Sequence, residues 1–239
     1  MAGHSKWANI KHRKGRQDAI KGKLFTRIIR EITVSAKLAG GDINSNPRLR
    51  SAVEAANSAN MPKEKIDRAI KKGSGGDESQ NLEEIRYEGY SPGGAAIIVD
   101  CVTDNRNRTV ADVRHAFSKA GGNLGTEGCV DFLFKKVGIL TVIDIEDEDA
   151  FLEKVLEGDV EDVQKISNNS FGVICAPESY FDIKDLLQDS GIALSDSEIT
   201  LVPTQEKELK GKHQVQTEKM IDFLEDVDDV QKIYTNAIF

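Results

Sequence analysis

Basic residues crowd the first thirty positions of the chain, where chemistry with phosphates is the natural expectation. Nine lysines and arginines stand there against one acid, Asp18, and they surround the only tryptophan, Trp7. Cations of this density neutralise phosphates and release counterions, and an indole can stack on a base. The alternative is a solvated basic tail whose tryptophan packs on its own domain. The candidate nucleic-acid-binding residues of this stretch are Lys6, Trp7, Lys11, His12, Arg13, Lys14, Arg16, Lys21, Lys23, Arg27 and Arg30.

A second basic stretch ends in Lys71 and Lys72, and we add both to the candidates. Arg68 and Lys72 are four residues apart, so they share a face if this stretch is helical, and they could extend the same basic surface. The equally simple alternative is an exposed helix stabilised by Glu64–Arg68 and Asp67–Lys71 ion pairs.

The polar segment 103–109 lies where an apolar, β-branched stretch gives way to a helical pattern. Backbone N–H groups at the start of a helix favour anions, so Arg106 and Arg108 could clamp a phosphate there. The alternative is a capping cluster made by Asp104 and Asn105, with the arginines merely exposed.

No segment has the spacing of a catalytic or metal site. Cys101, Cys129 and Cys175 are too scattered for a disulfide scaffold or a tetrahedral zinc site. The acidic run 144–149 lacks the glycine and distant glutamate of a calcium loop, so acids in the first turn of a helix explain it better. We expect no catalytic residues, no metal and no cofactor. A metal-dependent nuclease or phosphotransferase using Asp104 is the alternative from a different class.

The charge of the chain is strongly segregated. Overall there are 32 Lys and Arg against 40 Asp and Glu, a net charge of −8, but residues 1–72 hold 17 against 6 and residues 131–204 hold 5 against 17. The chain therefore reads as a cationic head on an anionic body. It has no apolar run of transmembrane length, no apolar stretch behind its basic start and few cysteines, so we expect a cytoplasmic protein without a membrane partner.

These basic residues need helices to position them. Apolar residues recur every three or four positions through 25–39, and Gly40-Gly41 ends that pattern. Asn46 and Pro47 signal the start of a second helix, and Pro62 opens a third at its first position. We predict a basic helical domain with a flexible N-terminal arm over residues 1–78.

Beyond the glycine-rich hinge 73–77 the period shortens to that of strands. Strands are expected at 82–90, 95–102 and 130–134, with a helix between the last two. Residues 139–202 then give the order β-α-β-β-α-β of a ferredoxin-like fold, and a helix near 220–224 and a strand at 230–234 close the chain. We predict a multidomain α and α+β protein with two ferredoxin-like domains. The first comprises 79–133 and 206–239, and the acidic second one, 134–205, is inserted in it.

Many short segments of this chain, taken in their order along the sequence, resemble the YebC/PmpR family. The first begins at residue 3, and together they extend to residue 236. The segments are Gly3-His4-Ser5-Lys6-Trp7, Ile10-Lys11-His12, Gly22-Lys23-Leu24-Phe25, Met61-Pro62-Lys63, Arg68-Ala69-Ile70-Lys71-Lys72-Gly73, Tyr87-Glu88-Gly89-Tyr90, Pro92-Gly93-Gly94, Thr103-Asp104-Asn105-Arg106-Asn107-Arg108-Thr109 and Asp228-Asp229-Val230-Gln231.

That resemblance implies three domains, the last inserted within the second, and a cytoplasmic DNA-binding transcriptional regulator without enzyme activity or cofactor. It also implies a rival, because mitochondrial relatives are translational activators and bacterial members are linked to ribosomes stalled on proline-rich sequences. Both targets offer phosphates to the same lysines. We therefore expect promoter DNA, or alternatively the ribosome and its RNA, as partner. We expect no small-molecule substrate, and a monomer or weak dimer.

Overall fold

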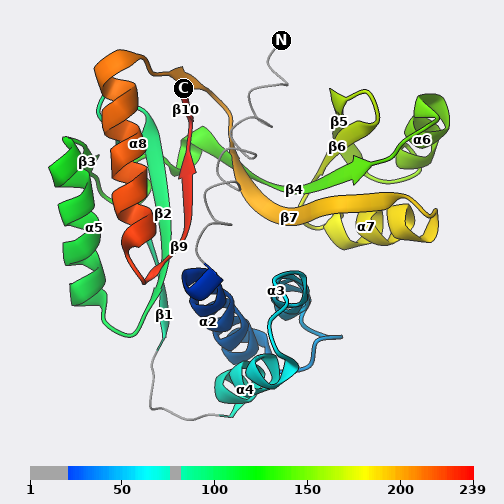
Figure 1. Ribbon diagram of the computed structural model, residues 1–239, viewed down its shortest axis with the longest axis horizontal. Coiled ribbons are helices and arrows are strands. Elements are labelled where there is room, and N and C mark those ends of the chain that lie inside the picture. The colour runs from blue at the N-terminus through cyan, green and yellow to red at the C-terminus, as the bar shows by residue number, and fades with distance from the viewer. Residues whose placement is uncertain (1–20, 76–81) are drawn as a thin grey trace. The chain divides into compact units, whose positions relative to one another are not determined.

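The computed structural model describes residues 21–75 and 82–239 of the chain (Figure 1). The described residues form two compact units, one made of Leu133–Gln205 and the other of 21–132 together with Glu206–Phe239. Both contain a four-stranded antiparallel sheet. The expectation of a mixed helical and α+β chain is confirmed at this level.

Three helices open the larger unit: α2 (Lys21–Ala39), α3 (Pro47–Ser58) and α4 (Lys63–Ser74). Asn46 caps α3, because its side chain accepts a hydrogen bond from the N–H of Leu49 at 3.0 Å. Its amide also donates to the carbonyls of Ser35 and Gly40, at 2.8 Å each, and so ties α3 to the end of α2. Pro62 precedes α4 as its N-cap residue, one position earlier than predicted.

These helices enclose an apolar core of their own. Ile32, Leu49 and Ala56 are fully buried in it, and Met61 and Ile66 are nearly so. The apolar spacing of the sequence predicted this face, because residues three or four apart lie on one side of a helix.

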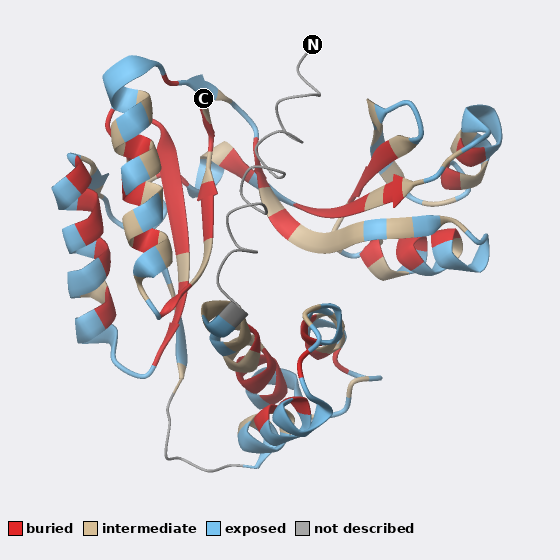
Figure 2. Cartoon of the chain, viewed as in Figure 1, coloured by how far each residue is buried: buried red, intermediate tan, exposed pale blue. Residues whose placement is uncertain are grey.

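The rest of the larger unit is a sheet covered by two helices. Its elements are β1 (Glu83–Tyr90), β2 (Ala96–Thr103), α5 (Arg106–Ala120), β3 (Asn123–Leu124), α8 (Gly211–Asp226) and β9 (Val230–Thr235), with strand order β3-β1-β2-β9. Buried residues run along β2 and alternate with exposed ones along α5 (Figure 2). The short strands β8 (Lys207–Glu208) and β10 (Ala237–Ile238) pair beside this sheet.

The connectivity of this sheet corrects the prediction of a second ferredoxin-like domain. Its elements run β-β-α-β-α-β, whereas a ferredoxin-like domain runs β-α-β-β-α-β. The tight turn between β1 and β2 explains the difference. The N–H of Ser91 donates to the carbonyl of Ala95 at 2.8 Å, and Gly93 and Gly94 adopt positive φ, so the two strands pair directly as a hairpin.

The strand expected at 130–134 is also wrong. A short 3₁₀-helix, η1 (Asp131–Leu133), occupies that stretch, and the third strand is the two-residue β3. The buried carboxylate of Glu88 accepts hydrogen bonds from the N–H groups of Gly128, Val130 and Asp131 at 2.8–3.0 Å. Those donors are therefore unavailable to a strand ladder, and the loop folds around the carboxylate instead.

The smaller unit contains β4 (Phe134–Ile143), α6 (Glu148–Val155), β5 (Val160–Ser167), β6 (Ser170–Cys175), α7 (Tyr180–Asp189) and β7 (Ala193–Pro203). Its strand order is β5-β6-β4-β7, and its elements run β-α-β-β-α-β. Leu140, Val173, Tyr180 and Leu187 are buried in its core. The acidic run before α6 acts as a cap, because the carboxylate of Asp147 accepts from the N–H of Ala150 at 3.0 Å.

No helix of the described residues has the length and apolarity needed to cross a membrane.

Candidate nucleic-acid interface

Helix α4 presents exposed cations that have no counterion. Lys63, Arg68 and Lys71 are exposed, and within the described ranges none of them makes a hydrogen bond or ion pair. Ile66 and Ala69 turn toward the core from the other side of the helix. This face of α4 can therefore offer its charges to an external anion.

The ion pairs that would have neutralised this face do not form among the residues that the structure describes. Arg68 makes no ion pair with Glu64, and Lys71 makes none with Asp67. The sequence left open whether these cations are locally paired or available. The geometry favours the second reading.

Helix α2 carries a basic stripe, which we define as Lys23, Arg27 and Arg30. The spacing of four and then three residues places all three on one face of the helix. Unlike those of α4, these cations have partners within the larger unit. Lys23 Nζ lies 2.7 Å from Asp226 Oδ1, and an Arg27 Nη donates to the carbonyl of Glu225 at 2.9 Å.

The partners of the stripe belong to an acidic corner, residues 225–229, where α8 ends and β9 begins. Arg30 reaches furthest into it, donating to the carbonyl of Asp228 and pairing with Asp229 Oδ1 at 3.0 Å. The last carbonyls of a helix carry partial negative charge, so the corner combines carboxylates with the negative end of α8. Burial lowers the pKa of the Arg27 guanidinium, while the nearby carboxylates of Glu225 and Asp228 oppose that shift.

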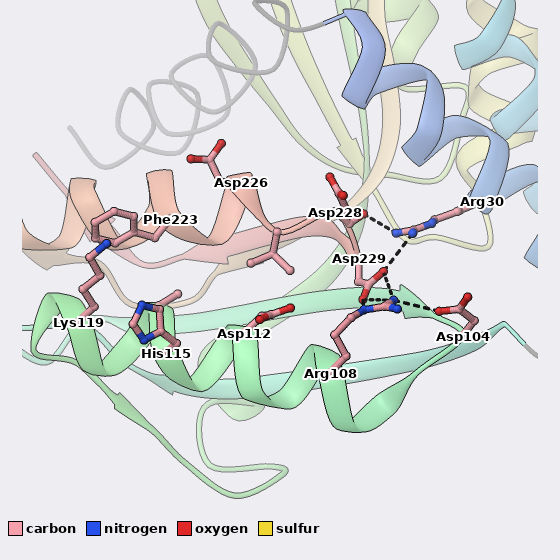
Figure 3. A pocket seen from close by; sticks show the side chains of 12 residues that line it. Arg30, Asp104, Arg108, Asp112, His115, Lys119, Phe223, Asp226, Asp228 and Asp229 are labelled. Atoms are coloured by element: carbon pink, nitrogen blue, oxygen red, sulfur yellow. Dashed lines mark hydrogen bonds and ion pairs between the residues drawn. The ribbon is translucent and has the colours of Figure 1, made fainter.

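Asp229 is the centre of this network, and its side chain is only 3% exposed. Besides Arg30, its carboxylate accepts from Arg108 at 2.8 Å, Thr109 at 2.8 Å and Thr103 at 3.1 Å. Burial alone would raise the pKa of Asp229, but the hydrogen bonds from Arg108 and Thr109, with the charge of Arg30, hold it below its ordinary value. Figure 3 shows the guanidinium groups of Arg30 and Arg108 converging on this carboxylate.

The segment 103–109 thus serves first as a structural junction. Asn105 caps α5 by accepting from the N–H of Arg108 at 3.1 Å, as the capping alternative expected. Arg108 pairs with Asp104 as well as with Asp229, so carboxylates of the protein itself neutralise its charge. Arg106, the first residue of α5, is exposed and makes no hydrogen bond or ion pair with any described residue.

An acidic groove lies beside this junction, between α5 and the end of α8 (Figure 3). Its volume is about 650 Å³, and it is lined by five aspartates together with Arg30, Arg108, Lys119 and His115. The excess of carboxylates over cations disfavours a phosphate there. Arg30 and Arg108 therefore stand in surroundings that disfavour the phosphate clamp considered from sequence.

The predicted residues divide into three groups. Lys6, Trp7, Lys11, His12, Arg13, Lys14 and Arg16 lie outside the described residues, and Lys21 begins α2. Lys23, Arg27, Arg30 and Arg108 are engaged inside the larger unit. Lys71, Lys72 and Arg106 are exposed. All of them remain predictions as nucleic-acid contacts.

Sequence reasoning left out three residues that the structure makes prominent. Lys63 and Arg68 are not among the candidates from sequence, although they share the exposed side of α4. Asp229 had no assigned role beyond the family resemblance. Its only local signal is the acidic run that separates a helical pattern from a strand.

No reactive thiol emerges from the three cysteines, which are free. Burial raises the pKa of Cys101 to about 12 and that of Cys175 to about 11, and it also raises the pKa of Cys129. These thiols are therefore protonated and poorly nucleophilic at neutral pH. Over residues 21–75 and 82–239 there is no group of three or more His, Cys, Asp or Glu side chains that could hold a metal ion.

Comparison with known proteins gives full-length matches. Residues 5–76 match the model of the TACO1/YebC protein N-terminal domain, and residues 82–237 match that of the TACO1/YebC second and third domain. A protein of Nitrosospira multiformis is 56% identical over 238 residues, covering 100% of this chain and 99% of its own length, and one of Aromatoleum aromaticum is 55% identical with the same coverage. Both are named probable transcriptional regulatory proteins.

A solved structure agrees with these matches. The crystal structure of a conserved hypothetical protein from Aquifex aeolicus superposes with a TM-score of 0.81 at 43% identity, covering 92% of this chain and 91% of that one.

Proposed function

Because this chain belongs to the TACO1/YebC family, we propose that it is a non-enzymatic, cytoplasmic regulator of gene expression that binds nucleic acid. We take promoter DNA as its first target and transcription as the step that it regulates. The names of its relatives support a regulatory role, since they are called probable transcriptional regulatory proteins.

The observation that carries the proposal is the exposed face of α4. Lys63, Arg68 and Lys71 stand on it without counterions among the described residues, whereas the other cations named above are largely paired. Cations without a counterion need not break an ion pair within the protein before they bind a phosphate backbone. The release of counterions from the nucleic acid then favours binding.

Charge segregation supports the same end of the chain as the binding end. Residues 21–75 hold 12 Lys and Arg against 5 Asp and Glu, while residues 133–205 hold 5 against 16. A polyanion is attracted to the first segment and repelled by the second. The helical segment therefore supplies the contact, and the acidic unit stays off the phosphates.

The ribosome is the second candidate target, and the amino-acid composition of α4 is compatible with binding to its RNA. The exposed side of α4 offers Lys, Arg, Glu and Asp, but the helix contains no Asn or Gln, the side chains that pair with adenine edges. The lysines and the arginine of α4 can contact the phosphates of ribosomal RNA as well as those of DNA.

A triple substitution tests the role of α4. Lys63→Ala/Arg68→Ala/Lys71→Ala should weaken binding to duplex DNA or ribosomal RNA by about tenfold or more at low salt, and reduce the slope of log K against log salt by about 3. The matched control is Lys135→Ala/Lys154→Ala/Lys165→Ala, which removes the same charge from three lysines already paired with Glu161, Glu157 and Glu148. Equal behaviour of the two variants would refute the assignment to α4.

Crosslinking in cells separates the two targets. A transcriptional regulator should yield crosslinks that peak at promoter DNA, and these should be lost in the α4 variant. Crosslinks concentrated on ribosomal RNA, with none enriched at promoters, would contradict a transcriptional regulator and support a translation factor that binds the ribosome.

A further inference from the structure

Ion pairs and hydrogen bonds cross the joint between the helices α2–α4 and the sheet of the larger unit. Each side also has an apolar core of its own. The polar contacts that cross the joint include those of the basic stripe, an Arg48–Glu84 pair and a bond from Lys37 to the carbonyl of Leu82. Charged contacts of this kind can be exchanged for contacts with another charged group.

From this geometry we propose that the acidic corner is an intramolecular competitor for nucleic acid, which latches the basic stripe of α2 until a polyanion displaces it. The inference rests on the proposed function, because it assumes that the helical segment meets phosphates. It adds that three of its cations are withheld in the resting state.

The chemistry of the corner matches that of a phosphate backbone. Lys23, Arg27 and Arg30 face carboxylate and carbonyl oxygens at 2.7–3.0 Å in the contacts measured above, distances at which they would also hold phosphate oxygens. Lys23 and Arg30 are seven positions apart in the helix, so the stripe is about 10 Å long. An extended polyanion can engage the whole stripe, as the corner does.

The outer contact of the latch is easily opened. The side chains of Lys23 and Asp226 are 33% and 71% exposed, so water and salt screen their attraction. Arg27 and Arg30 lie deeper, and Arg30 is 20% exposed. A polyanion would therefore meet Lys23 first and then compete for the two arginines.

When the basic stripe leaves the acidic corner, the buried groups on both sides keep other partners. When Arg30 leaves, Asp229 still accepts from Arg108, Thr103 and Thr109, so the buried carboxylate is not orphaned. Helix α2 keeps its packing against α3 and α4. Opening therefore exposes the stripe without unfolding either part.

Two measurements on the full chain test the latch, with a fluorescein-labelled duplex of about 20 base pairs as probe. The first compares Glu225→Gln/Asp226→Asn/Asp228→Asn with the control Glu83→Gln/Glu127→Gln/Glu153→Gln. The control removes the same charge from three exposed acids that have no ion pair among the described residues. The variant removes the Lys23–Asp226 ion pair and the attraction of Arg27 to the carboxylates of Glu225 and Asp228, and it leaves the backbone carbonyls in place. Since one exposed ion pair corresponds to a factor of about 2 to 5, the corner variant should bind about two- to fivefold more tightly than the control.

The second measurement needs no variant. Hydrogen exchange of the unmodified protein should show, on adding the duplex, slower exchange in α2 and faster exchange at residues 226–230. Equal affinities of the two amide variants, or an acidic corner that gains protection with DNA, would overturn the latch.

The outcomes separate the latch from the proposed function. If the α4 alanine variant loses binding while the corner variant equals its control, the function stands and the latch fails. If no variant and no unmodified protein binds the duplex or ribosomal RNA, the proposed function fails and the latch with it.

Discussion

Asp229 shows how one carboxylate organises a junction of distant segments. It is buried and accepts from Thr103, Arg108 and Thr109 of the β2–α5 junction and from Arg30 of α2. A buried charge is tolerated when it is paired and fully hydrogen-bonded, and it becomes costly when a partner is removed.

Replacing this carboxylate should therefore destabilise the chain strongly. Asp229→Asn leaves Arg30 and Arg108 without their shared anion, and we expect a loss of about 2–4 kcal/mol, seen as a fall in the melting temperature of about 5–10 °C by calorimetry. Asp228→Asn is the matched control, because Asp228 is exposed and contributes its backbone carbonyl to Arg30. A control that melts as early as Asp229→Asn would contradict the central role of Asp229.

The depressed pKa of Asp229 predicts a pH dependence of known sign. The unfolded chain binds a proton near the ordinary value of 3.8, whereas the folded chain binds it at lower pH. Stability from Asp229 is thus fully present above pH 3.8 and is lost as the pH falls through the folded pKa. The difference in melting temperature between the unmodified protein and Asp229→Asn should stay constant from about pH 5 to 7 and shrink below pH 3.8. A difference that instead grew on acidification would show that the sign is wrong.

At the scale of elements, the close approach of α2 and α4 depends on Gly73. A Cβ atom there would lie 2.2 Å from the carbonyl oxygen of Thr33 and 2.8 Å from the Cβ of Ala36. Gly73→Ala should therefore destabilise the helices by about 1–3 kcal/mol although alanine favours helices.

Gly22→Ala is the natural control for that substitution, because nothing lies within 4 Å of a Cβ at Gly22 in α2. It should leave the melting temperature unchanged or raise it slightly. If circular dichroism shows that Gly73→Ala melts no earlier than Gly22→Ala, the two helices are not packed as closely as described.

Local patterns predicted most helices and strands, and failed where a distant group decides the outcome. The three helices of the N-terminal segment and the order β-α-β-β-α-β of the smaller unit follow from apolar period and capping residues. The strand expected at 130–134 had the right alternation, since Val130 is buried and Phe132 is 70% exposed. The carboxylate of Glu88, more than forty residues away, folds that stretch into a turn, and no local window contains it.

The site was predictable in its charges but not in its contacts. Spacing alone placed Arg68, Lys71 and Lys72 on a basic helix. The partners of Lys23 and Arg27 lie 203 and 198 residues away along the chain, so no motif could show that these cations are occupied. A single sequence gives the type of an ionisable group, and the fold decides whether it is paired.

For the whole molecule, segregated charge predicts which part touches nucleic acid. A photoreactive residue at position 63 of α4 should crosslink to bound duplex DNA or ribosomal RNA, because Arg68 and Lys71 on the same side of the helix make no ion pair with any residue that the structure describes. The same residue at position 153, in an acidic and exposed part of α6, should give about one tenth of that yield or less. Comparable yields from both positions would contradict the assignment of the binding end.

The salt dependence of nucleic-acid affinity is the sharpest test of a cationic binding end. If about six cations of the basic N-terminal segment neutralise backbone phosphates, log K for a duplex should fall linearly against log salt with a slope near −5, and Lys11→Ala/Arg13→Ala/Lys14→Ala/Arg16→Ala should flatten it while leaving the melting temperature unchanged. An affinity that stays constant across the salt series would contradict a protein that grips a polyanion through its cationic end.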